Sequence, residues 1–203
     1  MHSVEEIKEL LRERLSKKRY THSLGVADAA LKLARTYGED PDKAYLAGLV
    51  HDICKEEEPE EQKRLMLEGN MNISGAELCA KALWHGPAGA YFIKTELGID
   101  DKDILNAVRY HTVGRPSMSR LEEIIYIADL ISEERDYKDV DKMRKLAFSD
   151  FEKAMYEAVC YGISSVVKKQ NYIPECTLDL YNQYTYLHSL RKKTKEKNDG
   201  RKQ

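Results

Sequence analysis

The sequence lacks the marks of several large classes of protein. It has four cysteines, Cys54, Cys79, Cys160 and Cys176, and no CxxC pair, so their spacing fits no zinc site built on cysteine. No stretch approaches the roughly 20 apolar residues that cross a bilayer, and the N-terminus carries no apolar signal core. Dispersed thiols without a secretion signal predict a reducing, cytoplasmic location and no membrane partner.

Three further absences concern fold and ligands. No run of alternating apolar and polar residues is long enough to predict a β-sheet. No GxxxxGK segment is present, which excludes a P-loop nucleotide enzyme. The net charge is only -2, so the overall charge gives no reason to expect nucleic acid as a partner.

Helix signals, in contrast, run along almost the whole chain. Capping boxes, in which Ser precedes Glu by three residues, begin at Ser3, Ser74, Ser119 and Ser149. With the period of the apolar residues, they predict helices at 3–16, 18–37, 41–54, 59–69, 75–84, 87–97, 101–111, 119–134, 139–147, 150–171 and 177–191. We expect one all-α domain over residues 1–190, followed by a basic, disordered tail at 191–203.

Candidate chemistry lies at the ends of apolar helical segments. Four histidines occur there, namely His22, His51, His85 and His111. One such histidine alone is more often a packed core residue than a ligand. The adjacent pair His51-Asp52 is also weak evidence, since chance predicts about 0.4 such pairs in this composition. Asp129 lies inside the apolar run IIYIADLI, where a bare carboxylate would be costly unless it binds metal or faces solvent.

Together these six side chains form a coherent set of metal ligands. Imidazole and carboxylate groups suit iron, manganese, cobalt or zinc. One divalent ion would be held by His22, His51, Asp52 and Asp129. A second would be held by Asp52, His85 and His111, so that Asp52 bridges the two. Such a pair of ions can clamp a phosphoryl group.

A family resemblance is carried by RYTHSLGVADAALKLA, AGLVHDICK, WHGPAGAYF, YHTVGRPSMSRLEEIIYIADLISEERDY and LDLYNQ. These strings resemble the HD superfamily of metal-dependent phosphohydrolases and, more narrowly, the YqeK family of bacterial symmetrical diadenosine tetraphosphate hydrolases. The resemblance implies an HD bundle of about ten helices, a di-iron centre on the six ligands, and cleavage of diadenosine tetraphosphate into two ADP. Tyr20 and Ser132-Glu133 depart from the Phe and the Ile-Glu-Pro-like segment of some relatives, which bears on substrate preference.

The reaction is expected to use a hydroxide that bridges the ions and attacks an inner phosphorus. Asp52 and Lys55 are the expected catalytic residues. Substrate phosphates are expected to contact Arg19, Lys55, Thr112 and Arg135. Lys55 follows His51 by four residues, which would place both on one helical face. Alternatively, the two arginines form surface salt bridges and Lys55 pairs with neighbouring glutamates.

Three other functions remain open. The chain could be another HD nucleotide phosphohydrolase or phosphodiesterase, such as a nucleotidase or an alarmone hydrolase, a nucleotide-binding sensor, or a purely structural helical protein. The expected partners are a dinucleoside polyphosphate and ADP- or GDP-like nucleotides, in a homodimer. The tyrosine-rich segment from Tyr172 to Tyr186 is either an interface or a cover for the core.

Overall fold

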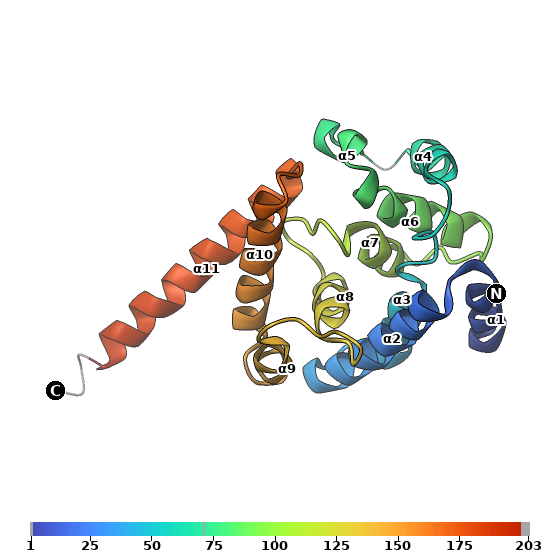
Figure 1. Cartoon of the computed structure of the whole chain (residues 1–203). Coiled ribbons are helices and arrows are strands. Elements are labelled where there is room, and N and C mark those ends of the chain that lie inside the picture. Colours follow the sequence, from blue (N-terminus) through green and yellow to red (C-terminus); the bar gives the residue numbers. More distant parts are fainter. Residues whose placement is uncertain (1, 71, 200–203) are drawn as a thin grey trace.

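Every regular element is a helix over the residues that the structure describes, 2–70 and 72–199, with residues 195–199 described by their backbone alone. In this computed structural model (Figure 1) the α-helices are α1 (Val4–Arg14), α2 (Lys17–Tyr37), α3 (Pro41–Val50), α4 (Pro59–Glu68), α5 (Gly75–Cys79), α6 (His85–Thr95), α7 (Lys102–Tyr110), α8 (Arg120–Ile131), α9 (Val140–Ser149), α10 (Phe151–Lys168) and α11 (Glu175–Asp199). A short 3-10 helix, η1 (Lys81–Leu83), precedes α6. The predicted all-α fold is confirmed.

Side-chain caps determine where several helices begin. Ser3, Ser74 and Ser119 form the predicted capping boxes of α1, α5 and α8, because each hydroxyl accepts a hydrogen bond from the backbone N–H three residues later. The fourth predicted box is wrong. Helix α10 is capped by Asp150 rather than Ser149, since the Asp150 carboxylate accepts a backbone hydrogen bond from the first turn.

Four helices form the centre of the bundle. Helix α2 packs along α3 and α8, and α7 packs against α3, α6 and α8 (Figure 1). The approach of α2 to α3 depends on Gly48, since a Cβ atom there would lie 2.9 Å from Ala27 Cα. Fully buried side chains fill this centre, including Leu33, Leu49, Ile124 and Ile127. These same four helices carry, or end at, most of the predicted ligands.

Several helices end earlier than the sequence predicted. The predicted helix 75–84 is divided into α5, which ends at Cys79, and η1, and α10 ends at Lys168 rather than at residue 171. Helix α3 ends at Val50 rather than at residue 54, and turns follow. There His51 Nδ1 donates a hydrogen bond to the Gly48 carbonyl at 2.7 Å. If the helix continued, this carbonyl would instead accept from the backbone N–H four residues later. The helical relation expected between His51 and Lys55 is therefore wrong. Helix α8 likewise ends at Ile131 rather than 134, because the next residue is extended.

Helix α11 packs against α10 and then extends away from the other helices (Figure 1). The sequence predicted a disordered tail from residue 191, whereas α11 continues to Asp199. Arg191 donates to both carboxylate oxygens of Asp150, at 2.7 and 3.0 Å. No Gly or Pro interrupts the chain before Gly200, and lysine, arginine and glutamate favour helix. Residues 200–203 lie outside the described residues.

The tyrosine-rich segment is divided between core and surface. Tyr184 is only 3% exposed, whereas Tyr172 and Tyr186 are 59% and 64% exposed. The segment therefore covers part of the core, and its role in a homodimer stays a prediction. Across residues 2–70 and 72–199, no helix is both long enough and apolar enough to cross a membrane.

Candidate metal centre

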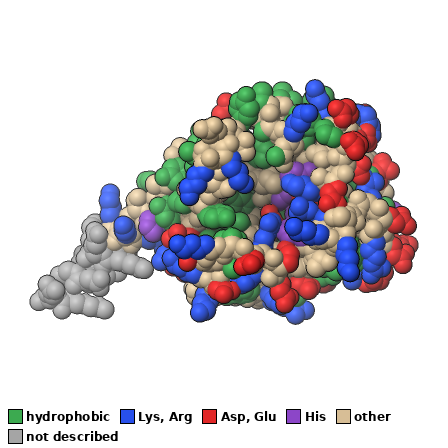
Figure 2. All heavy atoms as spheres, viewed as in Figure 1, with side chains coloured by type: hydrophobic (Ala, Val, Ile, Leu, Met, Phe, Trp, Pro, Cys, Tyr) green, Lys and Arg blue, Asp and Glu red, His purple; other side chains and the backbone are tan. Residues whose placement is uncertain are grey.

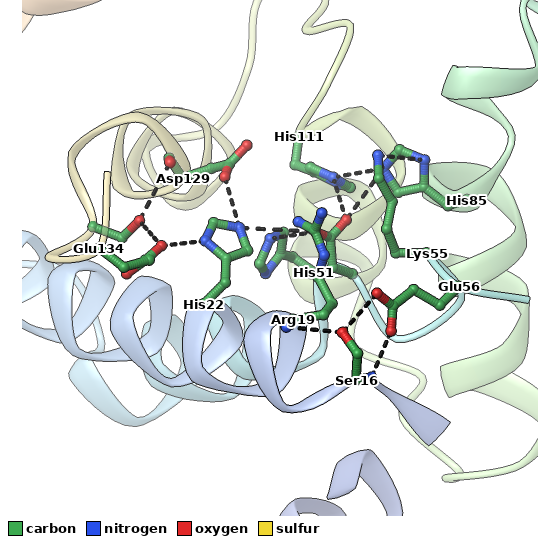
Figure 3. Close-up of polar contacts among 12 residues, drawn as sticks. Ser16, Arg19, His22, His51, Lys55, Glu56, His85, His111, Asp129 and Glu134 are labelled. Atoms are coloured by element: carbon green, nitrogen blue, oxygen red, sulfur yellow. Dashed lines mark hydrogen bonds and ion pairs between the residues drawn. The ribbon is translucent and has the colours of Figure 1, made fainter. Parts of the chain in front are cut away.

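The six predicted ligand side chains converge on one place from five parts of the chain, and five of them are labelled in Figure 3. Helix α2 supplies His22, the turn after α3 supplies His51 and Asp52, the start of α6 supplies His85, the end of α7 supplies His111, and the last turn of α8 supplies Asp129. Five of them are at most 5% exposed, and the Asp129 side chain is 20% exposed. Figure 2 shows histidine atoms at the bottom of a hollow, beside Lys and Arg side chains.

Asp52 lies between two pairs of histidines. Its Oδ1 atom is 3.2 Å from His85 Nε2 and 3.5 Å from His111 Nε2. Its Oδ2 atom is 3.4 Å from His51 Nε2 and 3.8 Å from His22 Nε2. Each carboxylate oxygen thus faces a different pair of imidazoles, which is the arrangement that a carboxylate bridging two ions requires.

Backbone carbonyls orient two of these rings. His51 Nδ1 donates to the Gly48 carbonyl and His111 Nδ1 donates to the Val108 carbonyl, each at 2.7 Å. A proton on Nδ1 leaves the lone pair on Nε2, and in both residues Nε2 is the atom that faces Asp52. Metal-binding histidines are commonly held in this way.

His22 is oriented by a carboxylate that the sequence did not suggest. Its Nε2 atom lies 3.0 Å from Asp129 Oδ1, while Nδ1 contacts Glu134 Oε1 (Figure 3). Glu134 lies in the loop after α8, and no spacing rule connects it to His22, which is 112 residues earlier. Its only signal in the sequence is its position between Asp129 and Arg135.

The two predicted arginines reach the site. Arg19 Nη1 donates to Asp52 Oδ2 at 2.8 Å. Arg135 donates through Nε to the Asp129 carbonyl oxygen at 2.7 Å and through Nη2 to the Asp129 carboxylate. Both guanidinium groups therefore bind candidate ligands rather than forming the isolated surface pairs considered as the alternative. Their contact with substrate phosphate stays a prediction.

Lys55 also points into the site. Its Nζ atom is 3.3 Å from His85 Nδ1 and 3.2 Å from Nε2, so the ammonium lies against the imidazole ring. The adjacent Glu56 and Glu57 bind other partners. Burial lowers the pKa of Lys55. Thr112 follows His111, and its Oγ1 atom is buried without a hydrogen-bond partner among the described residues.

The surroundings keep the two acids of the site ionised and shift the pKa values of two of its histidines in opposite directions. Burial would raise the pKa of Asp52, but the contacts with His51, His111 and His85 together outweigh burial and hold that pKa well below its usual range. Burial would also raise the pKa of Asp129, but the contact with His22 outweighs burial and lowers that pKa. Burial would lower the pKa of His22, but the contacts with Asp129 and Glu134 outweigh it and raise that pKa. Burial lowers the pKa of His85 to about 4, so its ring is neutral at pH 7. Anionic carboxylates and neutral imidazoles are the forms that bind divalent ions.

Unsatisfied polar atoms show that these residues fit a metal ion. His22 Nε2, His51 Nε2 and Asp52 Oδ1 are buried and have no aligned hydrogen-bond partner among the described residues. Such atoms are rare in native proteins because their desolvation is not compensated. Ligand atoms of His22, His51 and Asp129 all lie within 4.8 Å of one another, as do those of His51, Asp52 and His111. A cation bound among them would satisfy these atoms.

Comparison with known proteins places this site in a family. Residues 19–134 match the HD domain family. The symmetrical bis(5'-nucleosyl)-tetraphosphatase of Halalkalibacterium halodurans is 38% identical over 175 residues, which cover 86% of this chain and 93% of that protein. The protein of the same name from Bacillus subtilis is 37% identical over 178 residues, which cover 88% and 95%.

A solved structure from Clostridium acetobutylicum, described as a predicted HD superfamily hydrolase involved in NAD metabolism, has a TM-score of 0.88 and 40% identity. The superposition covers 92% of this chain and 98% of that one. The segment that matches the HD domain contains all six predicted ligands and also Glu134.

Proposed function

The chain belongs to the HD domain family, and on this basis we propose that it is a metal-dependent hydrolase that cleaves diadenosine tetraphosphate symmetrically into two ADP. The observation that carries the proposal is Asp52, whose two oxygens face different pairs of imidazoles. Relatives named for this activity are 37–38% identical over most of the chain.

The proposed cofactor is a pair of divalent ions, with iron favoured and manganese, cobalt or zinc as alternatives. One ion would be held by His22, His51, Asp52 and Asp129, and the other by Asp52, His85 and His111. The first site is supported by the buried Nε2 atoms of His22 and His51, which have no aligned partner among the described residues. The second site is supported by the cluster of His51, Asp52 and His111. When bound, such ions supply Lewis-acid polarisation of phosphoryl oxygens and lower the pKa of water.

The reaction adds water across the central anhydride of the substrate. The oxygen of water bonds to one inner phosphorus, the bond from that phosphorus to the bridging oxygen breaks, and the bridging oxygen leaves with the second ADP. Arg19, Arg135 and Lys55 lie around the ligands and would neutralise phosphate charge during attack and departure. The Thr112 hydroxyl, which has no partner among the described residues, would donate to a phosphate oxygen.

The finer assignments of partner and location belong to the same proposal. ADP- and GDP-like nucleotides would bind as products or product analogues. The exposed side chains of Tyr186 and Leu190 on α11 offer an apolar surface for the proposed homodimer. All four cysteines are free thiols, which suits the proposed cytoplasmic location. Cys54 is buried, Cys160 and Cys176 are partly buried, and Cys79 is exposed.

The test is a product analysis with metal added back. Untagged protein, freed of metal and then supplied with Fe²⁺ or Mn²⁺, should convert diadenosine tetraphosphate to ADP alone, and in H₂¹⁸O one of the two ADP molecules should carry the label. AMP together with ATP would refute symmetrical cleavage. Failure to cleave this substrate, with turnover of nucleoside monophosphates, cyclic nucleotides or alarmones, would instead support one of the other HD activities.

A further inference from the structure

Glu134 contacts the side of the His22 ring that faces away from the other predicted ligands. His22 Nε2 faces the acids of the site, at 3.0 Å from Asp129 Oδ1 and 3.8 Å from Asp52 Oδ2. The opposite ring nitrogen, Nδ1, contacts Glu134 Oε1. A carboxylate at Nδ1 keeps a proton there, so the lone pair is left on Nε2, where a metal ion would bind.

Glu134 is itself held in place by two neighbours. Ser132 Oγ donates to the same Oε1 atom at 2.6 Å. The other oxygen, Oε2, occupies space beside α2 that is free only because residue 25 is glycine, since a Cβ atom there would clash with it. Gly25 lies one helical turn after His22, on the same face of α2. The loop after α8 and the surface of α2 are thus complementary at this carboxylate.

His22 differs in this respect from the other predicted ligands. His51 and His111 donate to the backbone carbonyls of Gly48 and Val108. These acceptors are uncharged, and they do not depend on the side chain at position 48 or 108. Among the residues that the structure describes, His22 is the one predicted ligand whose Nδ1 contacts a carboxylate. A carboxylate raises the basicity of the imidazole more than a carbonyl does, so it strengthens the bond to a metal ion.

We infer that Glu134 is a positioning residue that orients His22 for metal binding, and that Gly25 keeps the space in which it does so. The inference rests on the metal centre of the proposed function. It predicts that the two ions differ in their dependence on this loop. The ion held by His22, His51 and Asp129 requires Glu134, whereas the ion beside His85 and His111 does not.

The experiment measures metal binding without substrate. Metal-free protein is titrated with Mn²⁺ by calorimetry, and with Co²⁺ while its visible absorption reports the ligand geometry. In Glu134→Ala one of the two binding steps should weaken by about 10–100-fold and the other should stay unchanged. Glu134→Gln, which keeps an oxygen acceptor but loses the charge, should show a smaller loss. Gly25→Ala should weaken the same step, since the added Cβ atom would displace the carboxylate of Glu134 without moving the backbone.

Glu133→Ala is the matched control, because it removes the neighbouring carboxylate of the same exposed loop. It should bind both Mn²⁺ ions as the unaltered protein does. Unchanged binding in both Glu134 variants, or an equal loss in Glu133→Ala, would overturn the role of Glu134. If Glu134→Ala fails to fold, as judged by circular dichroism, the isosteric Gln variant supplies the test. Absence of Mn²⁺ binding by the unaltered protein would overturn the metal centre itself, and this role with it.

Discussion

The packing of α2 against α3 gives a sharp prediction for Gly48→Ala. The added Cβ atom would lie 2.9 Å from Ala27 Cα and 3.1 Å from both Ala27 N and the Val26 carbonyl oxygen. All three atoms belong to the backbone of α2, so no side chain can move aside. Carbon atoms pack at about 3.5–4.0 Å, so the two helices must separate by at least about 0.6 Å.

Two opposing terms set the change in stability. Overpacking of this kind costs about 1–3 kcal/mol, while removal of a glycine from a helix interior returns about 0.5–1 kcal/mol. We therefore expect a net loss of up to about 2.5 kcal/mol in the free energy of unfolding. Because α2 carries His22 and α3 leads into His51, the separation also moves the two histidines apart. A misplacement near 1 Å can cost about 100-fold in rate, so turnover should fall at least about tenfold.

The assay is urea unfolding of the metal-free protein, together with turnover of diadenosine tetraphosphate at saturating Mn²⁺. Gly162→Ala is the control, since that glycine also lies inside a helix but its Cβ would meet only Tyr126 Oη, at 3.4 Å. The free energy of unfolding of Gly162→Ala should rise by about 0.5–1 kcal/mol, and its turnover should stay unchanged. If Gly48→Ala is as stable and as active as this control, the close approach of α2 to α3 does not position the site.

Three further predictions follow from the site and the core. Asp52→Ala should still bind ADP in calorimetry but lose turnover by about 1,000-fold or more, since it removes the proposed bridge; unchanged turnover would exclude that role. Cys54 is fully buried, and burial raises its pKa to about 12. Maleimide should therefore label the exposed Cys79 in the native protein and label Cys54 only after unfolding, as measured by peptide mass spectrometry. Equal labelling rates of the two thiols would contradict the packing of Cys54. Mn²⁺ at about 100 times its dissociation constant should add about 2.7 kcal/mol per site to the free energy of unfolding, whereas an unchanged urea midpoint would exclude selective binding to the folded state.

Local signals account for most of the predicted helices. A capping box needs only residues three apart, and Ser3, Ser74 and Ser119 form the boxes that the sequence predicted. The period of the apolar residues predicted the all-α fold in the same local way. Where a side chain competes for the helix hydrogen bonds the prediction was wrong, as at His51, whose ring takes the carbonyl that would have continued α3.

The ligands could be found in the sequence because they break an apolar pattern. Asp129 interrupts a buried run, and His51 and Asp52 end one, so each stands out against neighbours that must be apolar. Glu134 could not be found in this way. It lies in an exposed, charge-rich loop where a glutamate is unremarkable, and its importance depends on a contact with a residue 112 positions earlier. Only the packing of α8 against α2 brings the two together.

The balance of charge around the ligands connects the site to its substrate. Asp52, Asp129 and Glu134 are offset by Arg19, Arg135 and Lys55, so these six groups are neutral together when the histidines are uncharged. Such balance is what a buried site requires in order to fold without metal. Two divalent ions would then leave a strong excess of positive charge in the hollow. A tetraphosphate bridge carries one negative charge on each phosphate and restores neutrality, whereas a monophosphate, with at most about two negative charges at pH 7, leaves about half of the excess. The same charges that let the protein fold therefore favour a polyphosphate over a shorter substrate.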